Sequence, residues 1–535
     1  MKIFKFCSKY LLSYKLMLAV HIFLVLCIAF IGILSPLITG NFLDSLVEGG
    51  TIEVVVRFCI IFAIISISNI LIGYISTILH TKLQTNMAYN LNKDTIAHLQ
   101  NLSLTYTNRI DTAYINQRVS GDSNEVMAFC IKVLQNTISS VMILVIPFAI
   151  MITINWFIAL LLLIFFALYI FLYVASKKII YITSYELKEQ RDSFLARLHE
   201  QIKHIRLVKL QGIDFINKLN TPFSNLMNIV IKNQKINYLV YGLDGFIQTL
   251  AQIMLFIVGG IQILNGNFTI GTFTIFSSYF SMVLRSVSYF FNLGKSYQNA
   301  LVSCTRLSDI FSNEKEEFGI NVIDNIKTIT LENVSLTRDK KQVINSFNAV
   351  FEKGKLYALA GENGSGKTTI IDLIMGMYIN EVQGRISYND ICIKEIDMQN
   401  LRKTNLSFVE QEPTLINDTI RYNITLSEEI VGDGEIFKYA QILGIESFIT
   451  EKTLDLQMDE KNTNTSGGEK QKMAILRALY KNAEVMIFDE PTSALDEKSI
   501  KLFTKYLLEA KKQKIIIIIT HEQRLKDICD IVLYL

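Results

Sequence analysis

Four stretches in the first half of the chain contain no Asp, Glu, Lys or Arg. They cover residues 16–43, 58–81, 133–176 and 245–284. A helix needs about 20 apolar residues to cross the hydrocarbon core of a bilayer, so the first two windows hold one span each. The last two are longer, and each has a polar break in its middle, at Asn155-Trp156 and at Asn265-Gly266-Asn267. Tight turns at these breaks predict two spans per window, and six membrane-spanning helices in all.

Lysine and arginine are concentrated on one side of the predicted spans. Lys2, Lys5, Lys9 and Lys15 precede the first window. The segments 82–132 and 177–244 are also rich in basic residues, whereas the stretch 44–57 has three carboxylates and Arg57 as its one basic residue. By the positive-inside rule, the N-terminus and both long segments are cytoplasmic. The first window is too long for the apolar region of a cleaved signal peptide, so we expect it to remain as a span.

The two long cytoplasmic segments mix polar and apolar positions and contain few Gly or Pro residues. We interpret each segment as two helical extensions joined by a small turn, because a structureless loop of such length is unusual. An extension of about 25 residues would reach roughly 35–40 Å below the membrane. It would then be long enough to contact a cytoplasmic domain.

The pattern changes after the sixth predicted span. From about residue 326, short β-branched runs such as 355–360, 485–488 and 515–519 alternate with helical stretches, which is typical of a soluble α/β domain. The run 515–519 is apolar but too short to span a bilayer, so a buried parallel strand is the better interpretation. We therefore expect an all-α, six-helix transmembrane domain at 1–312, a linker at 313–325 and a cytoplasmic α/β domain at 326–535.

Composition agrees with a membrane protein and argues against several other classes. The chain is 50% hydrophobic and 19% charged, whereas about a quarter of the residues of soluble domains are charged. A formal net charge of +3 is too small to indicate a nucleic-acid partner. The seven cysteines lie far apart and form no C-x-x-C pair, which argues against a metal cluster or a disulfide framework. Abundant Ile, Lys and Asn indicate an AT-rich bacterial genome, and hence a bacterial cytoplasmic membrane.

One glycine-rich loop has the residues that bind nucleotide phosphates. It reads Gly361-Glu362-Asn363-Gly364-Ser365-Gly366-Lys367-Thr368-Thr369 and fits the pattern G-x-x-x-x-G-K-[ST]. An apolar strand precedes it and a helical stretch follows, as the pattern requires. Glycines allow backbone N–H groups to converge on phosphate oxygens at the N-terminus of a helix. Lys367 would then reach the β- and γ-phosphates, and Thr368 would ligate Mg²⁺.

Two carboxylates end a later apolar strand, at Asp489 and Glu490. At the end of a strand, Asp489 can hold Mg²⁺ through water, and Glu490 is placed to polarise the water that attacks the γ-phosphate. The alternative interpretation is a solvated strand terminus. The order of the remaining motifs favours the catalytic one.

Together these residues resemble the ATP-binding cassette (ABC) family. Thr465-Ser466-Gly467-Gly468-Glu469, followed by a helix with Arg477, resembles the signature motif of that family. Gln411 resembles the glutamine loop, Asp496 the D-loop aspartate, His521 the switch histidine, and Glu460 a glutamate that contacts intracellular loops in exporters. The resemblance implies an α/β P-loop NTPase that binds ATP and Mg²⁺. It assigns Glu490 and His521 to hydrolysis, Gln411 to nucleotide and metal contacts, and Ser466–Glu469 and Asp496 to the nucleotide.

The resemblance also implies a dimer and a direction of transport. In this family each nucleotide lies between the Lys367-type loop of one subunit and the Ser466–Gly468 motif of the other. Because Glu490 and His521 are both present, two copies would form two competent sites, which favours a homodimer over a heterodimer. Residues 36–40 with Asp44, 118–122 and 209–215 resemble segments of exporter half-units. The half-unit length and the signature ending in Glu469 resemble bacterial exporters of small peptides, which implies membrane lipid around the protein and a small peptide as its cargo.

Other functions of the same fold are export of a lipid or a drug, and an ATP-gated channel or regulator. Glu490 argues against the channel, because such proteins often lack the hydrolytic glutamate. The charge-free windows exclude a soluble cassette protein that acts on ribosomes.

Some positions depart from the family pattern or leave alternatives open. Thr465 replaces the usual Leu, Glu469 replaces Gln, and no aromatic residue near 334–338 is placed to stack on adenine. Arg338 is either a stacking guanidinium or a solvated side chain. Arg285, the one full charge inside the sixth span, either faces a substrate cavity or snorkels toward the cytoplasm.

Overall fold

The computed structural model describes residues 2–108, 112–313, 315–338, 341–362, 364–429, 432–446, 449–450, 453–458 and 466–535. The chain divides into two compact units. The helical unit comprises Met1–Leu102 and Tyr106–Glu314, and the α/β unit comprises Ser103–Thr105 and Lys315–Leu535. Each unit is built around its own apolar core.

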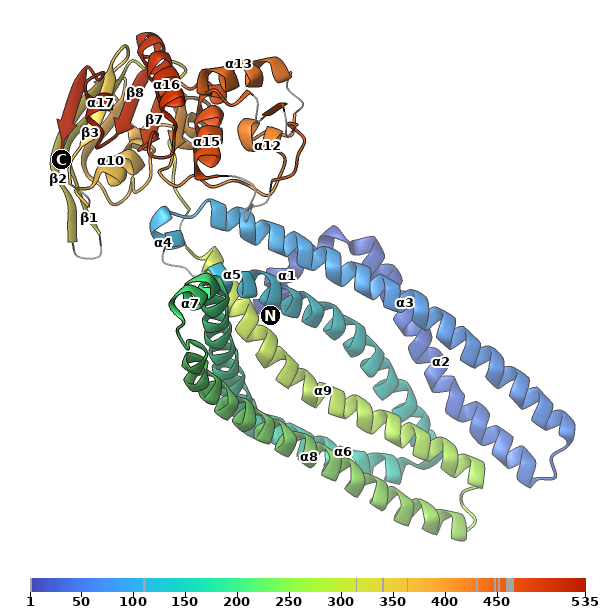
Figure 1. The fold of residues 1–535 in the computed structure, drawn as a ribbon. Helices are drawn as coiled ribbons and strands as arrows, with labels where there is room; N and C mark the ends of the chain where they lie inside the picture. Colours follow the sequence, from blue (N-terminus) through green and yellow to red (C-terminus); the bar gives the residue numbers. More distant parts are fainter. Residues whose placement is uncertain are drawn as a thin grey trace. The chain divides into compact units, whose positions relative to one another are not determined.

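Helices, several of them very long, make up the helical unit, with the short helix α4 beginning in the part of the chain that packs in the α/β unit (Figure 1). They are α1 (Lys2–Ser13), α2 (Lys15–Val47), α3 (Ile52–Gln100), α4 (Leu104–Asn108), α5 (Thr112–Gln117), the π-helical turn η1 (Arg118–Asp122), α6 (Ser123–Lys203), α7 (Ile205–Gln211), the 3₁₀ turn η2 (Ile216–Leu219), α8 (Asn220–Leu264) and α9 (Ile270–Phe311). Helices α6, α8 and α9 share an apolar core with Phe276, Tyr279 and Phe280 at its centre. The segments 82–132 and 177–244, which the sequence predicts to be cytoplasmic, are helical along most of their described length.

Both predicted polar breaks are confirmed as turns. Asn155 leaves the helical conformation, with φ −157° and ψ 101°, and divides α6 into two helices. Its side-chain oxygen accepts a hydrogen bond from the Ile158 N–H at 3.2 Å, which caps the helix that follows. The second break, Asn265–Asn267, lies between the end of α8 and the start of α9.

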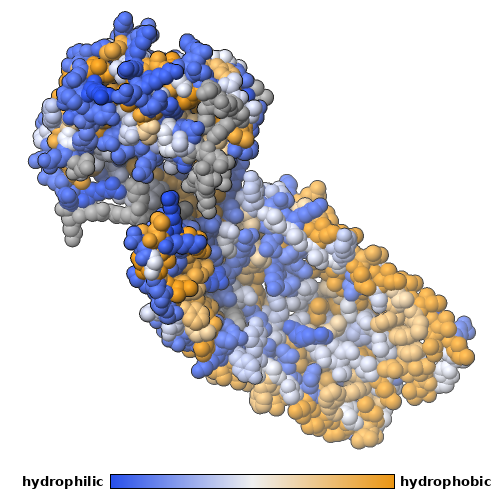
Figure 2. Space-filling view, viewed as in Figure 1, coloured by the Kyte–Doolittle hydropathy of each residue, from blue (hydrophilic) through white to orange (hydrophobic). Residues whose placement is uncertain are grey.

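Five stretches of the described residues are long and apolar enough to cross a membrane. They are Lys15–Val47, Ile52–Gln100, Ile115–Leu160, Leu162–Lys203 and Ile216–Leu264. The sixth predicted span lies in α9, which is helical over 42 residues but more polar than the other five. Large apolar side chains are exposed along α3, from Ile60 to Tyr74, and Figure 2 shows hydrophobic residues over much of the helical unit. Lipid is the solvent that covers such surfaces.

A buried group of charged side chains joins α9, η1 and α6. The Arg306 guanidinium on α9 forms ion pairs with Asp122 in η1, where Nε and Oδ2 are 3.1 Å apart, and with Asp192 on α6. All three side chains are less than a tenth exposed. Nearby, Lys188 contacts Glu125 at 2.7 Å. A buried charge is strongly destabilising unless it is paired, so these ion pairs constrain how α9, η1 and α6 pack together.

The α/β unit contains two sheets (Figure 1). Their strands are β1 (Thr328–Arg338), β2 (Lys341–Glu352), β3 (Leu356–Ala360), β4 (Gln383–Tyr388), β5 (Ile391–Cys392), β6 (Leu406–Val409), β7 (Val485–Asp489), β8 (Ile515–Ile519) and β9 (Ile531–Tyr534). The antiparallel sheet has the order β2-β1-β4-β5, and the parallel-paired sheet has the order β6-β7-β8-β3-β9. Strands β3, β7 and β8 are buried along their whole length, which confirms the three predicted strands. The polar residues that follow these strands therefore meet at one edge of the sheet.

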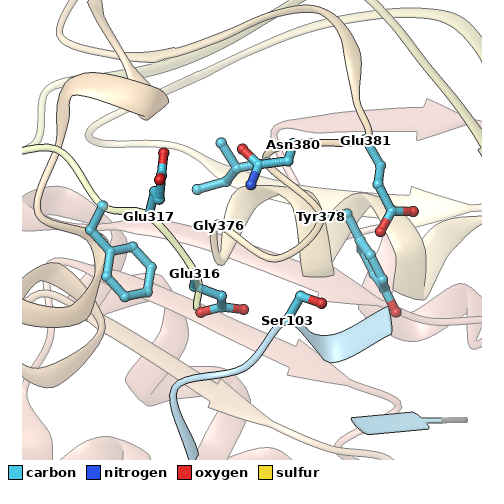
Figure 3. Close-up of a pocket in the computed structure, with 9 residues that line it drawn as sticks. Ser103, Glu316, Glu317, Gly376, Tyr378, Asn380 and Glu381 are labelled. Atoms are coloured by element: carbon cyan, nitrogen blue, oxygen red, sulfur yellow. The ribbon is translucent and has the colours of Figure 1, made fainter. Parts of the chain in front are cut away.

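The α/β unit also contains helices. They are α10 (Lys367–Ile374), α11 (Met398–Thr404), α12 (Ile420–Thr425), α13 (Asp433–Leu443), α15 (Gly467–Lys481), α16 (Glu497–Ala510) and α17 (Gln523–Lys526). The short stretch Ser103–Thr105 also packs in this unit, where the Thr105 hydroxyl donates to the Glu381 carboxylate. A cavity of about 40 Å³ lies beside it, lined by Ser103, Glu316 and Tyr378 (Figure 3). Because the cavity is so small, it is not a nucleotide site.

Candidate nucleotide site

The glycine-rich loop joins β3 to α10. Gly364 and Gly366 adopt left-handed backbone conformations, with φ of +82° and +100°. A Cβ atom on Gly366 would also lie 3.1 Å from the Val343 carbonyl oxygen, so a larger residue would strain this turn. Gly366 is the N-cap of α10, and backbone N–H groups are therefore available where the helix begins. Asn363, which belongs to the predicted motif, lies outside the described residues.

Lys367 is buried against this loop. Its Nζ donates to the carbonyl oxygens of Gly361 at 2.9 Å and Glu362 at 2.8 Å. The Ser365 Oγ atom is buried and has no hydrogen-bond partner among the described residues. A phosphate group fits this environment, because its oxygens would accept from Ser365, the loop N–H groups and the ammonium together.

Thr368 and Asp489 approach each other from different elements. The Thr368 hydroxyl, on the first turn of α10, lies 3.3 Å from Asp489 Oδ2 at the end of β7. Burial raises the pKa of Asp489, while the Thr368 hydrogen bond and nearby Lys367 oppose that rise. A hydroxyl and a carboxylate are oxygen donors of the type that Mg²⁺ prefers. The residues present therefore fit the predicted metal.

Gln411, Glu490 and His521 come together although they lie far apart in the sequence. The Gln411 side-chain amide donates to Glu490 Oε2 at 3.0 Å, and His521 Nε2 lies 3.7 Å from Glu490 Oε1. Glu490 has a left-handed backbone conformation, φ +44°, and its N–H donates to the Ile519 carbonyl at 3.0 Å. A non-glycine residue in this conformation is uncommon and carries strain, as is frequent at functional sites.

One acidic residue near this site was not predicted from the sequence. Burial, with the nearby charges of Asp489 and Glu410, raises the pKa of Asp372 to about 6, although Arg338 opposes the rise. Asp372 lies four residues after Thr368 on α10, so the helical repeat could have placed both on one face. Its proximity to the charge of Asp489 comes from the fold of the sheet, which the sequence alone does not give.

The signature residues begin a different helix. Ser466 is the N-cap of α15, and it forms a capping box with Glu469: each side chain bonds to the backbone N–H of the other, at 2.6 and 3.2 Å. Gly468 is also required, because a Cβ atom there would lie 2.5 Å from the Ala494 carbonyl oxygen. Ser466 and Gly467 are exposed. Thr465 and Glu460 lie outside the described residues.

Asp496 connects the D-loop to the signature helix. Its carboxylate forms an ion pair with Lys472 of α15 at 2.6 Å and also accepts from Ser499. The Lys472 ammonium holds the pKa of Asp496 well below its usual range. Among the described residues, no hydrogen bond or ion pair joins Ser466–Glu469 or Asp496 to the loop 361–369. Within the described residues, one chain therefore brings together the residues predicted to contact phosphate, to hold the metal and to carry out hydrolysis, but it does not bring the signature residues to them.

The structure shows the surroundings of Arg338 and Arg285, for each of which the sequence left two interpretations open. The Arg338 guanidinium lies over the Tyr378 ring, 5.4 Å from its centroid, so it packs on an aromatic side chain of its own chain. Neither predicted environment included Tyr378. Arg285 is exposed, and its Nε donates to the Ser281 carbonyl at 3.3 Å. This contact leaves both predictions for Arg285 open.

Both halves of the chain match models of known families. The ABC transporter transmembrane region matches residues 18–287, and the ABC transporter model matches residues 344–493. The chain belongs to the ABC transporter family. An ABC ATPase domain implies ATP binding, and the apolar helices support a membrane-embedded protein.

Known relatives of this ABC transporter have several named functions. The ATP-dependent lipid A-core flippase of Haemophilus ducreyi is 26% identical over 84% of this chain and 78% of its own length. The lactococcin-G-processing and transport ATP-binding protein of Lactococcus lactis is 29% identical over 63% of this chain and 49% of its own length. A bacterial Atm1-family ABC exporter, solved with ATP bound, aligns with TM-score 0.88 and 20% identity over 98% of this chain and 93% of that one. The transporter thus has an exporter fold.

Proposed function

We propose that this ABC transporter hydrolyses ATP to export a small peptide from the cytoplasm. The observation that carries this proposal is the position of Glu490, which lies between Gln411 and His521 and directly follows the buried Asp489. An ATP site with a hydrolytic carboxylate, in one chain with membrane-spanning helices, supports a pump. A channel or regulator would not need that carboxylate.

In this proposal the chain's own residues divide the work of hydrolysis. Lys367, Ser365 and the loop N–H groups bind and orient the phosphates. Thr368 and Asp489 would hold Mg²⁺, with the Gln411 amide oxygen beside them, and the ion would neutralise phosphate charge. Glu490 would accept a proton from the attacking water, and His521 would orient the γ-phosphate.

Two copies of the chain would complete each site. Ser466 and Gly467 are exposed at the N-terminus of α15, which is a favourable position for phosphate oxygens. Among the described residues they form no hydrogen bond or ion pair with the loop 361–369 of their own chain, so in this proposal a second copy would supply them. The two ATP-binding domains would close around the γ-phosphate and separate after hydrolysis. This movement would change the arrangement of the membrane-spanning helices. Since Glu490 and His521 occur in the same chain, a homodimer would have two active sites.

A peptide cargo is supported by the relative named for lactococcin-G processing and transport. A lipid cargo is the second candidate, because the lipid A-core flippase relative aligns over 84% of this chain. For location, we propose the bacterial cytoplasmic membrane, with both termini in the cytoplasm, on the basis of the Lys and Arg distribution.

The test is ATPase stimulation of the full chain in lipid nanodiscs, with separate panels of peptides, lipids and drugs. Export of a peptide predicts saturable stimulation by peptides and their ATP-dependent accumulation in inverted proteoliposomes. The Glu490→Gln variant serves as the control that cannot turn over. Stimulation and flipping of a lipid without any response to peptides would contradict the peptide proposal and support the lipid one.

A further inference from the structure

An open pocket lined mainly by polar residues, with Lys132 exposed, lies in the helical unit where α2, α3 and α6 meet. Its volume is about 440 Å³, within the range of about 300–1,000 Å³ that small-molecule sites occupy. Its lining includes His21, Ser76, His80, Gln84, Lys132 and Asn136. We call these residues the histidine–lysine cavity. None of them belongs to the nucleotide site.

The position of this cavity along the spans can be read from the helices. His21 lies six residues after Lys15, the first residue of α2, which corresponds to about 9 Å along the helix. His80 and Lys132 lie at the cytoplasmic ends of their charge-free windows, which run over 58–81 and 133–176. All three helices therefore place the cavity near the inner leaflet, at the level where a cytoplasmic substrate would enter.

His21 is the most buried of the lining residues that titrate. It is 1% exposed, its Nδ1 lies 3.3 Å from the Ser76 hydroxyl, and its ring centroid lies 5.7 Å from that of His80. Its Nε2 makes no hydrogen bond of good geometry among the described residues, although the Gln135 side chain, which also lines the cavity, lies beside the ring. Both the Ser76 hydroxyl and the Gln135 amide therefore lie next to an imidazole that can also bind a ligand group.

The cavity lining carries basic side chains and no carboxylate among the described residues. Lys132 lies close enough to His80 for their charges to interact. Glu125, about two turns before Lys132 on the same helix, is already paired with Lys188 at 2.7 Å. Ionisable side chains within a membrane domain usually mark a substrate or ion pathway.

From this arrangement we propose that the histidine–lysine cavity binds an anionic oxygen group of the transported molecule. Lys132 supplies the charge, and His21, His80 and Asn136 supply hydrogen bonds. The group is the terminal carboxylate of a peptide or, with the same chemistry, the phosphate of a lipid. The inference rests on the proposed export function, and it adds that the cargo must carry a negative end group.

The experiment compares matched charged and neutral probes on the full chain in phosphatidylcholine nanodiscs. One pair is a fluorescent hydrophobic hexapeptide with a free C-terminal carboxylate and the same peptide amidated. The other pair is fluorescent phosphatidate and fluorescent diacylglycerol. The variant is Lys132→Gln, with Lys132→Arg as the conservative variant. Lys178→Gln, an exposed lysine at the cytoplasmic end of another span, is the matched control.

The proposal predicts that the wild type binds one charged probe more tightly than its neutral partner. Lys132→Gln should weaken binding of that probe about tenfold, the loss expected for one charge-assisted hydrogen bond. It should leave the neutral probe unchanged, while Lys132→Arg and Lys178→Gln keep the preference. Thermal stability of each variant shows that the loss is not due to misfolding. His80→Gln, which should also reduce the preference, replaces Lys132→Gln if the latter does not fold.

The outcomes separate this inference from the proposed function. Equal binding of charged and neutral probes by the wild type would overturn the cavity proposal. The proposal would also be overturned if Lys132→Gln lowered the affinity for the charged and the neutral probe of a pair by the same factor. Peptide-stimulated ATPase activity without a carboxylate preference would leave peptide export standing while rejecting the cavity. A preference confined to phosphatidate would support the cavity and reject the peptide as cargo.

Discussion

The Gln411 amide donates to one oxygen of the Glu490 carboxylate at 3.0 Å, while His521 lies 3.7 Å from the other oxygen. A carboxylate held at one oxygen keeps a fixed orientation, and its second oxygen can still accept a proton from water. The left-handed backbone of Glu490 adds to this constraint, because few residues reach such a conformation without support from the surrounding structure. The three residues therefore act as a unit in the proposed hydrolysis.

We predict that Glu490→Gln lowers steady-state ATPase activity at least about 100-fold, since general-base catalysis contributes roughly 10²–10⁴-fold. ATP binding should persist, because Lys367 and the loop N–H groups are unchanged, and a long-lived ATP-bound dimer should accumulate. Turnover is measured by phosphate release, and the dimer by crosslinking. Glu497→Gln makes the same charge change at an exposed residue of α16 and should behave as the wild type. Near-normal turnover of Glu490→Gln would remove Glu490 from the mechanism.

Lys367→Ala should act on ATP binding itself. The ammonium donates to two loop carbonyls, so it is positioned before any phosphate arrives and contributes in the ground state. Loss of a charge-assisted hydrogen bond of about 1.5–3 kcal/mol predicts an ATP affinity roughly 10–100-fold weaker. Fluorescent-nucleotide titration measures this change, with exposed Lys498→Ala as the control. An unchanged dissociation constant would show that another residue neutralises the phosphates.

Much of this architecture could be predicted because its signals are local. Asn155 interrupts an apolar window and does break α6, and the runs that end at Ala360, Asp489 and Ile519 do form buried strands. Contacts between distant segments gave no such signal. Hydropathy marks a span but not the neighbour that it faces, so neither the pairing of His21 with Ser76 nor the packing of Arg338 on Tyr378 was visible. The polar character of α9 has a similar cause, since its Ser and Tyr residues bond to neighbouring helices instead of facing lipid.

The half-buried carboxylate of Asp372 predicts a pH-dependent stability. Its pKa is raised to about 6 in the folded protein, against about 3.9 in an unfolded chain. The folded state therefore binds more protons between roughly pH 4 and 6, and the stability contributed by this group falls as the pH rises through that window.

Asp372→Asn removes that cost, so its melting temperature should exceed that of the wild type by about 2–4 °C above pH 6. The difference should disappear below about pH 4. Thermal unfolding monitored at a series of pH values tests this, with Asp390→Asn at an exposed turn as the control. A stabilisation that does not depend on pH would show that charge is not its cause.

The buried ion pairs of Arg306 are expected to stabilise the helical unit. Removal of one partner from a buried ion pair typically costs about 3–5 kcal/mol, because the remaining charges stay buried without compensation. Arg306→Met keeps much of the side chain's volume but leaves Asp122 and Asp192 buried without their cationic partner, so it should lower the melting temperature strongly. Arg197→Met is the matched control. Arg197 pairs with Glu200 at an exposed site, and such pairs contribute at most about 1 kcal/mol.

A double variant distinguishes loss of the charge balance from loss of packing. Adding Asp192→Asn to Arg306→Met removes one of the uncompensated carboxylates, so part of the lost stability should return. The two effects would then be non-additive, as expected for residues in direct contact. If Asp192→Asn instead destabilises the Arg306→Met variant as much as it destabilises the wild type, the two residues are not energetically coupled. The ion pair would then not be what joins α9 to α6.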